Sequence, residues 1–297
     1  ECCAEEETTL CSHCGERIYR HDNAGDEDTP LCQRCYENHY YRCDRCGRII
    51  YEGDAYYASD DEEQDYPLCH ACYSSRNRGR AIQDYYYKPE PLFRGDGPRY
   101  FGVELEIDGA GEDNSSAREV MEIANSNGLE NLYCKHDGSL DDGFEMVTHP
   151  MTLDYHRKEM PWKKILHCAV DMGYTSHQAG TCGLHVHVNR DAFGDTERAQ
   201  DAVIARILFF FETSVNLTNA DTIEFRIFRG TLKYNTLIVT LQLLDRICDV
   251  ALFLSDDEIK AMSWTTFVSG CTAPELVQYL KERRLYVNDP VESEGEV

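Results

Sequence analysis

The sequence has 297 residues, with 54 acidic and 29 basic side chains, which gives a formal net charge of −25. A chain this acidic is a poor general ligand for phosphate backbones or anionic lipid, so neither nucleic acid nor a membrane surface is an expected partner. No apolar stretch reaches the roughly 18 to 20 residues of a transmembrane helix, and no signal peptide is visible. The length suits one large and one small domain, and we expect a cytoplasmic protein.

The cysteines are distributed unevenly: eight of the fifteen form four Cys-x-x-Cys pairs before residue 73. The pairs are Cys11/Cys14, Cys32/Cys35, Cys43/Cys46 and Cys69/Cys72. Zinc takes four ligands and favours thiolates, and a two-residue spacing lets one tight turn present both sulfurs to one ion. The eight cysteines therefore predict two structural zinc ions, with a sequential pairing as the simplest arrangement and an interleaved one also open. Disulfides or an iron–sulfur site are the alternatives.

The two halves of this segment, residues 11–35 and 43–72, repeat one pattern. Their layout resembles LIM-type and other treble-clef or ribbon modules, although seven residues separate the halves where a LIM domain has two. We expect residues 1–90 to form a LIM-like module in which zinc replaces a large core. Binding of a protein partner and pure scaffolding are both open as further roles. Cys2 and Cys3 suggest a further, truncated knuckle, and 59–65 an acidic solvated loop.

From residue 98 onward the composition is that of a packed domain, which we place at 98–297. Strands are expected at 101–107, 144–147, 184–188 and 222–228. Helices are expected at 115–126, 152–172, 195–211, 234–255 and 273–284. Pro161 should break the second helix, and Ser115 and Ser116 with Glu119 should cap the first. Strands and helices interleave irregularly, which favours an α+β fold with an antiparallel or mixed sheet.

Three of the expected strands alternate apolar residues with chemically active ones. Because residues two apart in a strand point the same way, one face of each strand carries a polar pair. The pairs are Glu104 with Glu106, His185 with His187, and Glu224 with Arg226, and Glu145 adds a further carboxylate. The opposite faces, Ile227 included, should pack against helices. Clustered carboxylates repel unless cations neutralise them, and this ligand set, which contains no lysine, suits Mg²⁺ or Mn²⁺. A half-exposed sheet face without metal is the alternative.

Five segments of this domain follow one another in a fixed order. They are Phe-Gly-Val-Glu-Leu-Glu-Ile (101–107), Lys-His-Asp-Gly-Ser-Leu (135–140), Gly-Phe-Glu-Met-Val-Thr-His-Pro (143–150), Cys-Gly-Leu-His-Val-His-Val (182–188) and Thr-Ile-Glu-Phe-Arg-Ile-Phe-Arg-Gly-Thr-Leu (222–232). Together they resemble the amidoligase family, carboxylate–amine ligases related to glutamine synthetase and glutamate–cysteine ligase. The resemblance covers residues 100–255 and leaves the cysteine-rich module outside.

The resemblance implies a curved antiparallel sheet of the glutamine-synthetase-like type, whose concave face holds ATP and divalent ions, Mg²⁺ or Mn²⁺. It implies metal and nucleotide binding by Glu104, Glu106, Glu145, His185 and Glu224. It further implies that His187, Arg226, Arg229 and Asp137 act on the phosphate or the substrate. The sequence departs from the family pattern in one respect, because no arginine stands at 212–221.

The activity implied by the resemblance is ATP-dependent formation of an amide or isopeptide bond through an acyl phosphate. The acid and the amine would be small molecules or groups of a peptide or protein. Two other functions are open from the residues alone. The same polar face suits a metal-dependent hydrolase, and the cysteine module suits a non-catalytic adaptor that carries a degenerate ligase domain.

Overall fold

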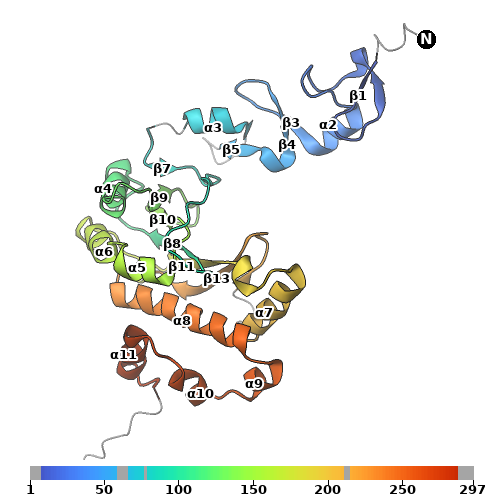
Figure 1. The fold of residues 1–297 in the computed structure, drawn as a ribbon. Helices are drawn as coiled ribbons and strands as arrows, with labels where there is room; N and C mark the ends of the chain where they lie inside the picture. The colour runs from blue at the N-terminus through green and yellow to red at the C-terminus, as the bar shows by residue number, and fades with distance from the viewer. Residues whose placement is uncertain (1–7, 59–65, 77–78, 211–214, 287–297) are drawn as a thin grey trace, which may run out of the picture. The chain divides into compact units, whose positions relative to one another are not determined.

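The computed structural model describes residues 8–58, 66–76, 79–210 and 215–286 (Figure 1). The chain divides into two units, Glu1–Lys88 and Pro89–Val297. The division lies close to the domain boundary expected from composition. The knuckle suggested by Cys2 and Cys3 and the acidic loop at 59–65 lie outside the described residues.

The first unit repeats one arrangement, in which an antiparallel hairpin is followed by a short helix. The first half contains β1 (Thr8–Leu10), β2 (Arg17–Tyr19), η1 (Arg20–Asp22) and α2 (Gln33–His39). The second half contains β3 (Tyr40–Arg42), β4 (Ile49–Tyr51), η2 (Glu52–Asp54), β5 (Tyr56–Ala58), β6 (Tyr66–Leu68) and α3 (His70–Arg76), and β7 (Ile82–Gln83) follows. In both halves one cysteine pair occupies the hairpin turn and the other lies at the start of the helix.

The first unit has two small hydrophobic clusters instead of one core. Three of the five buried members of the first cluster are cysteines, as are two of the five in the second. Adjacent residues of β4 contribute to different clusters, Ile49 to the first and Ile50 to the second. Because successive side chains of a strand point to opposite faces, one face of β4 packs in the first cluster and its other face packs in the second.

The second unit is built on an antiparallel sheet. Its strands are β8 (Phe101–Ile107), β9 (Leu132–Lys135), β10 (Phe144–Thr148), β11 (Gly183–Asn189), β12 (Val215–Asn216) and β13 (Thr222–Arg229). They lie in the order β12-β13-β11-β8-β10-β9, and neighbours in this order are antiparallel. The α+β prediction and the four expected strands are confirmed, whereas β9 and β12 were not predicted.

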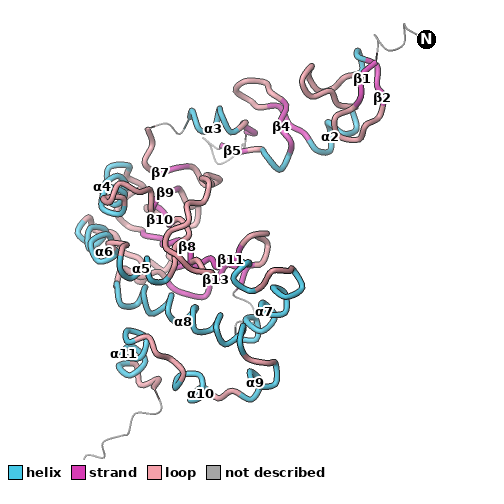
Figure 2. Tube along the Cα trace, viewed as in Figure 1, coloured by secondary structure: helices cyan, strands magenta, loops and turns pink. Residues whose placement is uncertain are grey.

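The helices of the second unit are α4 (Asn114–Ala124), α5 (Leu153–Lys158), α6 (Trp162–Asp171), η3 (Arg190–Phe193), α7 (Glu197–Phe210), α8 (Tyr234–Phe253), α9 (Asp256–Ala261), α10 (Trp264–Ser269) and α11 (Pro274–Glu282). The last three lie on the side of α8 away from the strands (Figure 1). Figure 2 shows α8 running along the sheet with α5 and α6 beside it. The predicted break at Pro161 is confirmed, because this residue caps α6. In the described part of the chain, no helix combines the length and apolarity that a membrane span requires.

The predicted cap of the first helix is wrong. The helix α4 begins at Asn114, and its N-cap is Asp113, whose carboxylate accepts a hydrogen bond of 2.8 Å from the Ser116 amide. The expected box of Ser115 and Ser116 with Glu119 therefore does not form the cap. A carboxylate next to the positive end of the helix dipole is a favourable acceptor for these unpaired amides, and this explains why the helix begins one residue earlier.

The prediction that Ile227 packs against helices is also wrong, since its side chain is 44% exposed. Leu184 of β11 pairs with Phe228 of β13, but Val186 pairs with Phe225, so β13 has one extra residue in this interval. Such a bulge ends the simple alternation of faces. Before the bulge Phe225 is fully buried, as predicted, whereas Ile227 lies within the bulge and no longer on the apolar face.

Candidate metal sites

The predicted cysteine ligands come together as two groups of four. The groups are Cys11, Cys14, Cys32 and Cys35, and Cys43, Cys46, Cys69 and Cys72, which is the sequential pairing. The sulfurs of Cys14 and Cys32 are 3.9 Å apart, and those of Cys46 and Cys69 are 3.7 Å apart. A tetrahedron with zinc–sulfur bonds near 2.3 Å has edges of about 3.8 Å. The residues present therefore fit zinc, and each group could hold one ion.

Tight glycine turns place the first two sulfurs of each group. The Gly15 amide donates to the Cys11 carbonyl at 2.9 Å, and the Gly47 amide donates to the Cys43 carbonyl at 2.8 Å. Both glycines have φ of +72°, a conformation that side chains with a Cβ rarely adopt. The Cys-x-x-Cys-Gly sequence thus gives the same knuckle in both hairpins.

The thiol acidities within each group point to a cation. Burial would raise the pKa of Cys11, but three backbone amides that donate to its sulfur lower this pKa to about 6. The pKa of Cys43 is lowered to about 6 in the same way. By contrast, burial and the neighbouring sulfurs raise the pKa values of Cys35 and Cys72 to about 12. Four adjacent thiols cannot all ionise unless a positive charge compensates them, and a zinc ion would supply it.

In the second unit, strand register brings the predicted acidic residues side by side. The cross-strand neighbours are Glu145 and Glu106, His185 and Glu104, and His187 and Glu224. Two groups that could hold a metal ion result: Glu104, His185 and Glu224 form one, and Glu106, Glu145 and His185 form the other. All five residues expected to bind metal and nucleotide therefore lie together on four adjacent strands. We call these five residues the carboxylate cluster.

His185 lies at the centre of the carboxylate cluster. Its Nδ1 atom is 3.6 Å from a carboxylate oxygen of Glu104, 3.8 Å from one of Glu224 and 3.9 Å from one of Glu106. Gly183 leaves the space that the imidazole needs, since a Cβ at that position would lie 2.7 Å from His185 Nε2. The Gly183 amide also donates to the Glu106 carboxylate. One glycine thus positions both a histidine and a carboxylate.

Burial makes the cluster electrostatically unfavourable without a cation. Burial and the charge of Glu104 raise the pKa of Glu145 to about 8, and burial also raises the pKa of Glu106. Burial acts on Glu104 in the same direction, but its hydrogen bonds with His185 and His187 hold its pKa well below the usual range. These donor groups fit a hard divalent ion, which would allow all the carboxylates to ionise together.

The expectation that this face carries no lysine is wrong. Lys135 of β9 lies opposite Glu145, and its Nζ atom is 3.2 Å from a Glu145 carboxylate oxygen. The predicted residue Asp137 lies close enough for its negative charge to raise the pKa values of Glu106 and Glu145. Lys135 and Asp137 stand two residues apart in the segment 135–140. That spacing was the available signal for Lys135, but β9 is too short to show an alternating pattern.

The other predicted residues differ in how closely they approach the cluster. His187 Nε2 is 3.2 Å from Glu104 Oε1, and one guanidinium nitrogen of Arg226 is 3.2 Å from Glu224 Oε1. The Arg226 side chain is 53% exposed, so it reaches from the buried carboxylate toward solvent. Arg229 is exposed and lies opposite Gly183 at the end of the sheet, and no ion pair with a described residue draws its side chain to the cluster.

Two further residues support the cluster and were not predicted from the sequence. Asp108, buried after β8, accepts hydrogen bonds from the Asp142 amide at 2.6 Å and the Thr181 hydroxyl at 2.7 Å. It thereby fixes the segments that lead into β10 and β11. Asn216 of β12 donates to Glu224 at 2.9 Å. Apart from the adjacent Gly109 amide, the donors to Asp108 are distant in sequence, so only the fold reveals its role.

Comparison with protein-family models gave no match, and comparison with curated proteins gave none either.

Proposed function

We propose that the second unit is an ATP-dependent carboxylate–amine ligase with a glutamine-synthetase-like sheet. The observation that carries this proposal is the pair of potential metal sites that share His185. They use the residues to which the resemblance with the amidoligase family assigns metal and nucleotide binding. The products would be an amide or isopeptide bond, ADP and phosphate.

The chemistry explains why such a site must manage charge. A carboxylate resists attack by an amine because oxide is a poor leaving group. Transfer of the γ-phosphoryl group of ATP to the carboxylate gives an acyl phosphate, and the amine then attacks its carbonyl carbon and displaces phosphate. The carboxylate cluster would hold Mg²⁺ or Mn²⁺, which when bound neutralises charge on the phosphates.

The residues at the edge of the cluster have distinct proposed tasks. Arg226, paired with Glu224 yet half-exposed, would contact the transferred phosphoryl group or the substrate carboxylate. His187 would lie near the same group, and its contacts with Glu104 and with the Thr222 hydroxyl at 3.2 Å hold its ring in place. Lys135 would balance the charge of Glu145. Arg229 and Asp137 would assist from the rim.

The first unit would serve as a zinc-stabilised module with two structural ions, and we propose that it also contacts a protein partner or a protein substrate. The described cysteines are free thiols. This supports a reducing compartment such as the cytoplasm, where thiolates remain available for zinc. Acid and amine substrates would be small molecules or side chains and termini of a peptide or protein.

Calorimetric titration of MgATP into the full chain tests the ligase proposal without knowledge of the substrates. We expect the wild-type protein to bind and Glu224→Gln to bind at least about tenfold more weakly, since it removes one charged ligand. Glu122→Gln, an exposed position on α4, is the matched control and should behave like the wild type. If neither the wild type nor the variants bind MgATP but the wild type binds Mn²⁺, the metal-dependent hydrolase replaces the ligase. If neither binds, the non-catalytic adaptor is favoured.

A further inference from the structure

A cavity of about 630 Å³ lies in the second unit at the end of β13. Its walls come from the end of α6, the segment 174–178, the turn after β13, one side of α8 and the end of α11. The volume falls within the range of about 300 to 1,000 Å³ that is typical of small-molecule sites. None of the five residues of the carboxylate cluster lines it, but Arg229, proposed above to assist at the rim of that cluster, does, so the cavity is a neighbouring site.

The charge of this cavity is opposite to that of the chain. Its lining includes the cationic side chains of Arg229, Lys233 and Arg283, and no aspartate or glutamate. Acidic residues outnumber basic ones by 54 to 29 in the whole sequence, so this selection is unusual. Among the described residues, none of the three cations takes part in an ion pair. The Arg283 guanidinium lies 5.2 Å from the centre of the Tyr279 ring, which holds it at the rim.

The rest of the lining mixes apolar and uncharged polar side chains. Val170, Val239 and Leu243 are aliphatic, whereas Ser176, His177, Gln178 and four threonines, two of them on α8, are polar. One of these hydroxyls, that of Thr240, already donates to the Thr236 carbonyl at 2.9 Å. A ligand that combines an apolar body with an anionic group would contact the aliphatic side chains and pair with the cations that no described residue neutralises.

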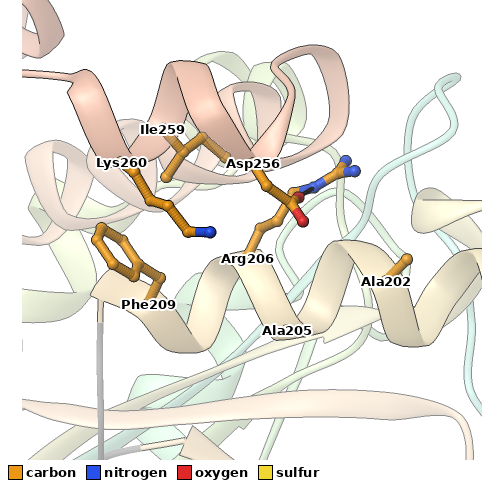
Figure 3. Close-up of a pocket in the computed structure, with 7 residues that line it drawn as sticks. All are labelled: Ala202, Ala205, Arg206, Phe209, Asp256, Ile259 and Lys260. Atoms are coloured by element: carbon orange, nitrogen blue, oxygen red, sulfur yellow. Dashed lines mark hydrogen bonds and ion pairs between the residues drawn. The ribbon is translucent and has the colours of Figure 1, made fainter.

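A second cavity, of about 250 Å³ between α7 and α9, shows the contrasting case (Figure 3). There, Arg206 lies beside Asp256, with 2.6 Å between Nε and Oδ1. A second guanidinium nitrogen donates to the Ala251 carbonyl at 3.1 Å. Lys260 also lines this cavity, and its charge contributes with that of Arg206 to lowering the pKa of Asp256. Because an aspartate lies among these cations, the smaller cavity has less reason to attract an anion.

We propose that the larger cavity binds an organic anion with an apolar body, held by Lys233, Arg283 and Arg229. The cavity wall is joined to the strands of the carboxylate cluster, because the Ser176 hydroxyl donates to the Glu106 carbonyl at 2.8 Å. The Gly230 amide makes a comparable bond of 3.1 Å to the Cys182 carbonyl. The binding of the anion does not depend on the proposed ligase activity and can be tested without it.

The test uses 8-anilinonaphthalene-1-sulfonate, an apolar fluorophore with one anionic group, and its neutral analogue N-phenyl-1-naphthylamine. We expect the anionic probe to bind the full chain with a blue-shifted emission. Lys233→Gln and Arg283→Gln should each weaken its binding at least about tenfold, since each removes a charged hydrogen bond. The neutral probe should respond less than about twofold to the same changes, because it has no group for the cations to bind.

Lys281→Gln is the matched control. Lys281 lies on the last turn of α11, which Arg283 caps, but it does not line the cavity. Its affinity for the anionic probe should equal that of the wild type. Thermal melting of each variant excludes unfolding as the cause of a loss. Equal binding of the anionic probe by all variants, or failure of the wild type to bind it, would overturn the proposal. Loss of MgATP binding in a separate titration would leave it untouched.

Discussion

The cysteine groups of the first unit and the carboxylate cluster of the second are both candidate metal sites, but they relate to stability in opposite ways. In the first unit the buried clusters are small and contain the ligands themselves, so without metal little remains to offset the entropy of the chain. In the second unit Val103, Leu105 and Ile107 of β8 are each 0% exposed, and the core consists of apolar side chains and not of metal ligands.

This difference separates two uses of metal. In the first unit, the free energy of zinc binding to the two cysteine groups would be free energy of folding. In the second unit the apolar face of the sheet supplies stability, while the opposite face gathers buried carboxylates that oppose folding. A fold that tolerates such a cluster retains it for a reason other than stability, and binding is the simplest one.

The largest predicted effect is the loss of a zinc site. Cys43→Ser should remove one of two zinc ions and unfold the second half of the first unit, because structural zinc contributes on the order of 10 kcal/mol to such modules. Zinc content and limited proteolysis would measure this loss. The two tryptophans, Trp162 and Trp264, both lie in the second unit, so their fluorescence should stay unchanged.

Cys168→Ser provides the control for this experiment, since Cys168 is buried on α6 and belongs to neither cysteine group. It should retain both zinc ions and the protease resistance of the first unit. A Cys43→Ser protein that lacks one zinc ion yet resists proteolysis would show that the small clusters suffice without metal.

The second prediction concerns acid, which should affect the second unit through a buried histidine. His156 is fully buried; its Nε2 lies 3.0 Å from the Phe101 carbonyl oxygen, and Trp162 donates to its Nδ1 at 3.3 Å. Burial lowers its pKa from 6.5 to about 4. The unfolded chain therefore takes up the proton first, so stability is fully present above pH 6.5 and falls by up to about 3 kcal/mol toward pH 4.

Urea unfolding followed by tryptophan fluorescence between pH 4 and 7 would measure this slope. His156→Gln should flatten it, even if the variant is less stable at every pH. His167→Gln, at a histidine whose side chain is 76% exposed, should leave the slope unchanged. An identical slope in all three proteins would assign the acid sensitivity to other groups.

The third prediction sets binding against stability within the carboxylate cluster. Glu106→Gln should stabilise the metal-free second unit by about 1 kcal/mol, because a neutral amide replaces a buried charge and can still accept the Gly183 hydrogen bond. The same change should weaken Mn²⁺ binding at least about tenfold. Unfolding and metal titration would be measured on one sample, with Glu122→Gln as the surface control. A less stable metal-free variant would mean that the carboxylate supports the fold.

Much of this arrangement could be predicted from local patterns. The two-residue spacing of the cysteines predicted both groups, and alternation predicted which acidic and histidine residues share a face. Local patterns also predicted the break at Pro161. They failed where an element is too short to show a period, as for β9 with four residues and β12 with two. The helices α9 and α10, of six residues each, were missed for the same reason.

Features that depend on a partner strand or loop could not be predicted at all. Three of the four hydrogen bonds to the Asp108 carboxylate come from residues 33 to 73 positions away in the sequence. Lys135 becomes part of the polar face only because β9 pairs with β10. The bulge in β13 likewise arises from its pairing with β11 and leaves no mark in the alternating sequence.

That bulge gives the smallest and most local prediction. Ile223 and Ile227 occupy equivalent positions in the alternating sequence, yet Ile223 is 0% exposed and Ile227 is 44% exposed. Ile223→Thr should cost about 2 kcal/mol, since it removes a buried methyl group and buries a hydroxyl, whereas Ile227→Thr should change stability by less than about 0.5 kcal/mol. Urea unfolding of both variants would measure the difference. Equal losses would mean that the strand alternates without interruption, and Arg229 would then lie on the face opposite to the carboxylate cluster.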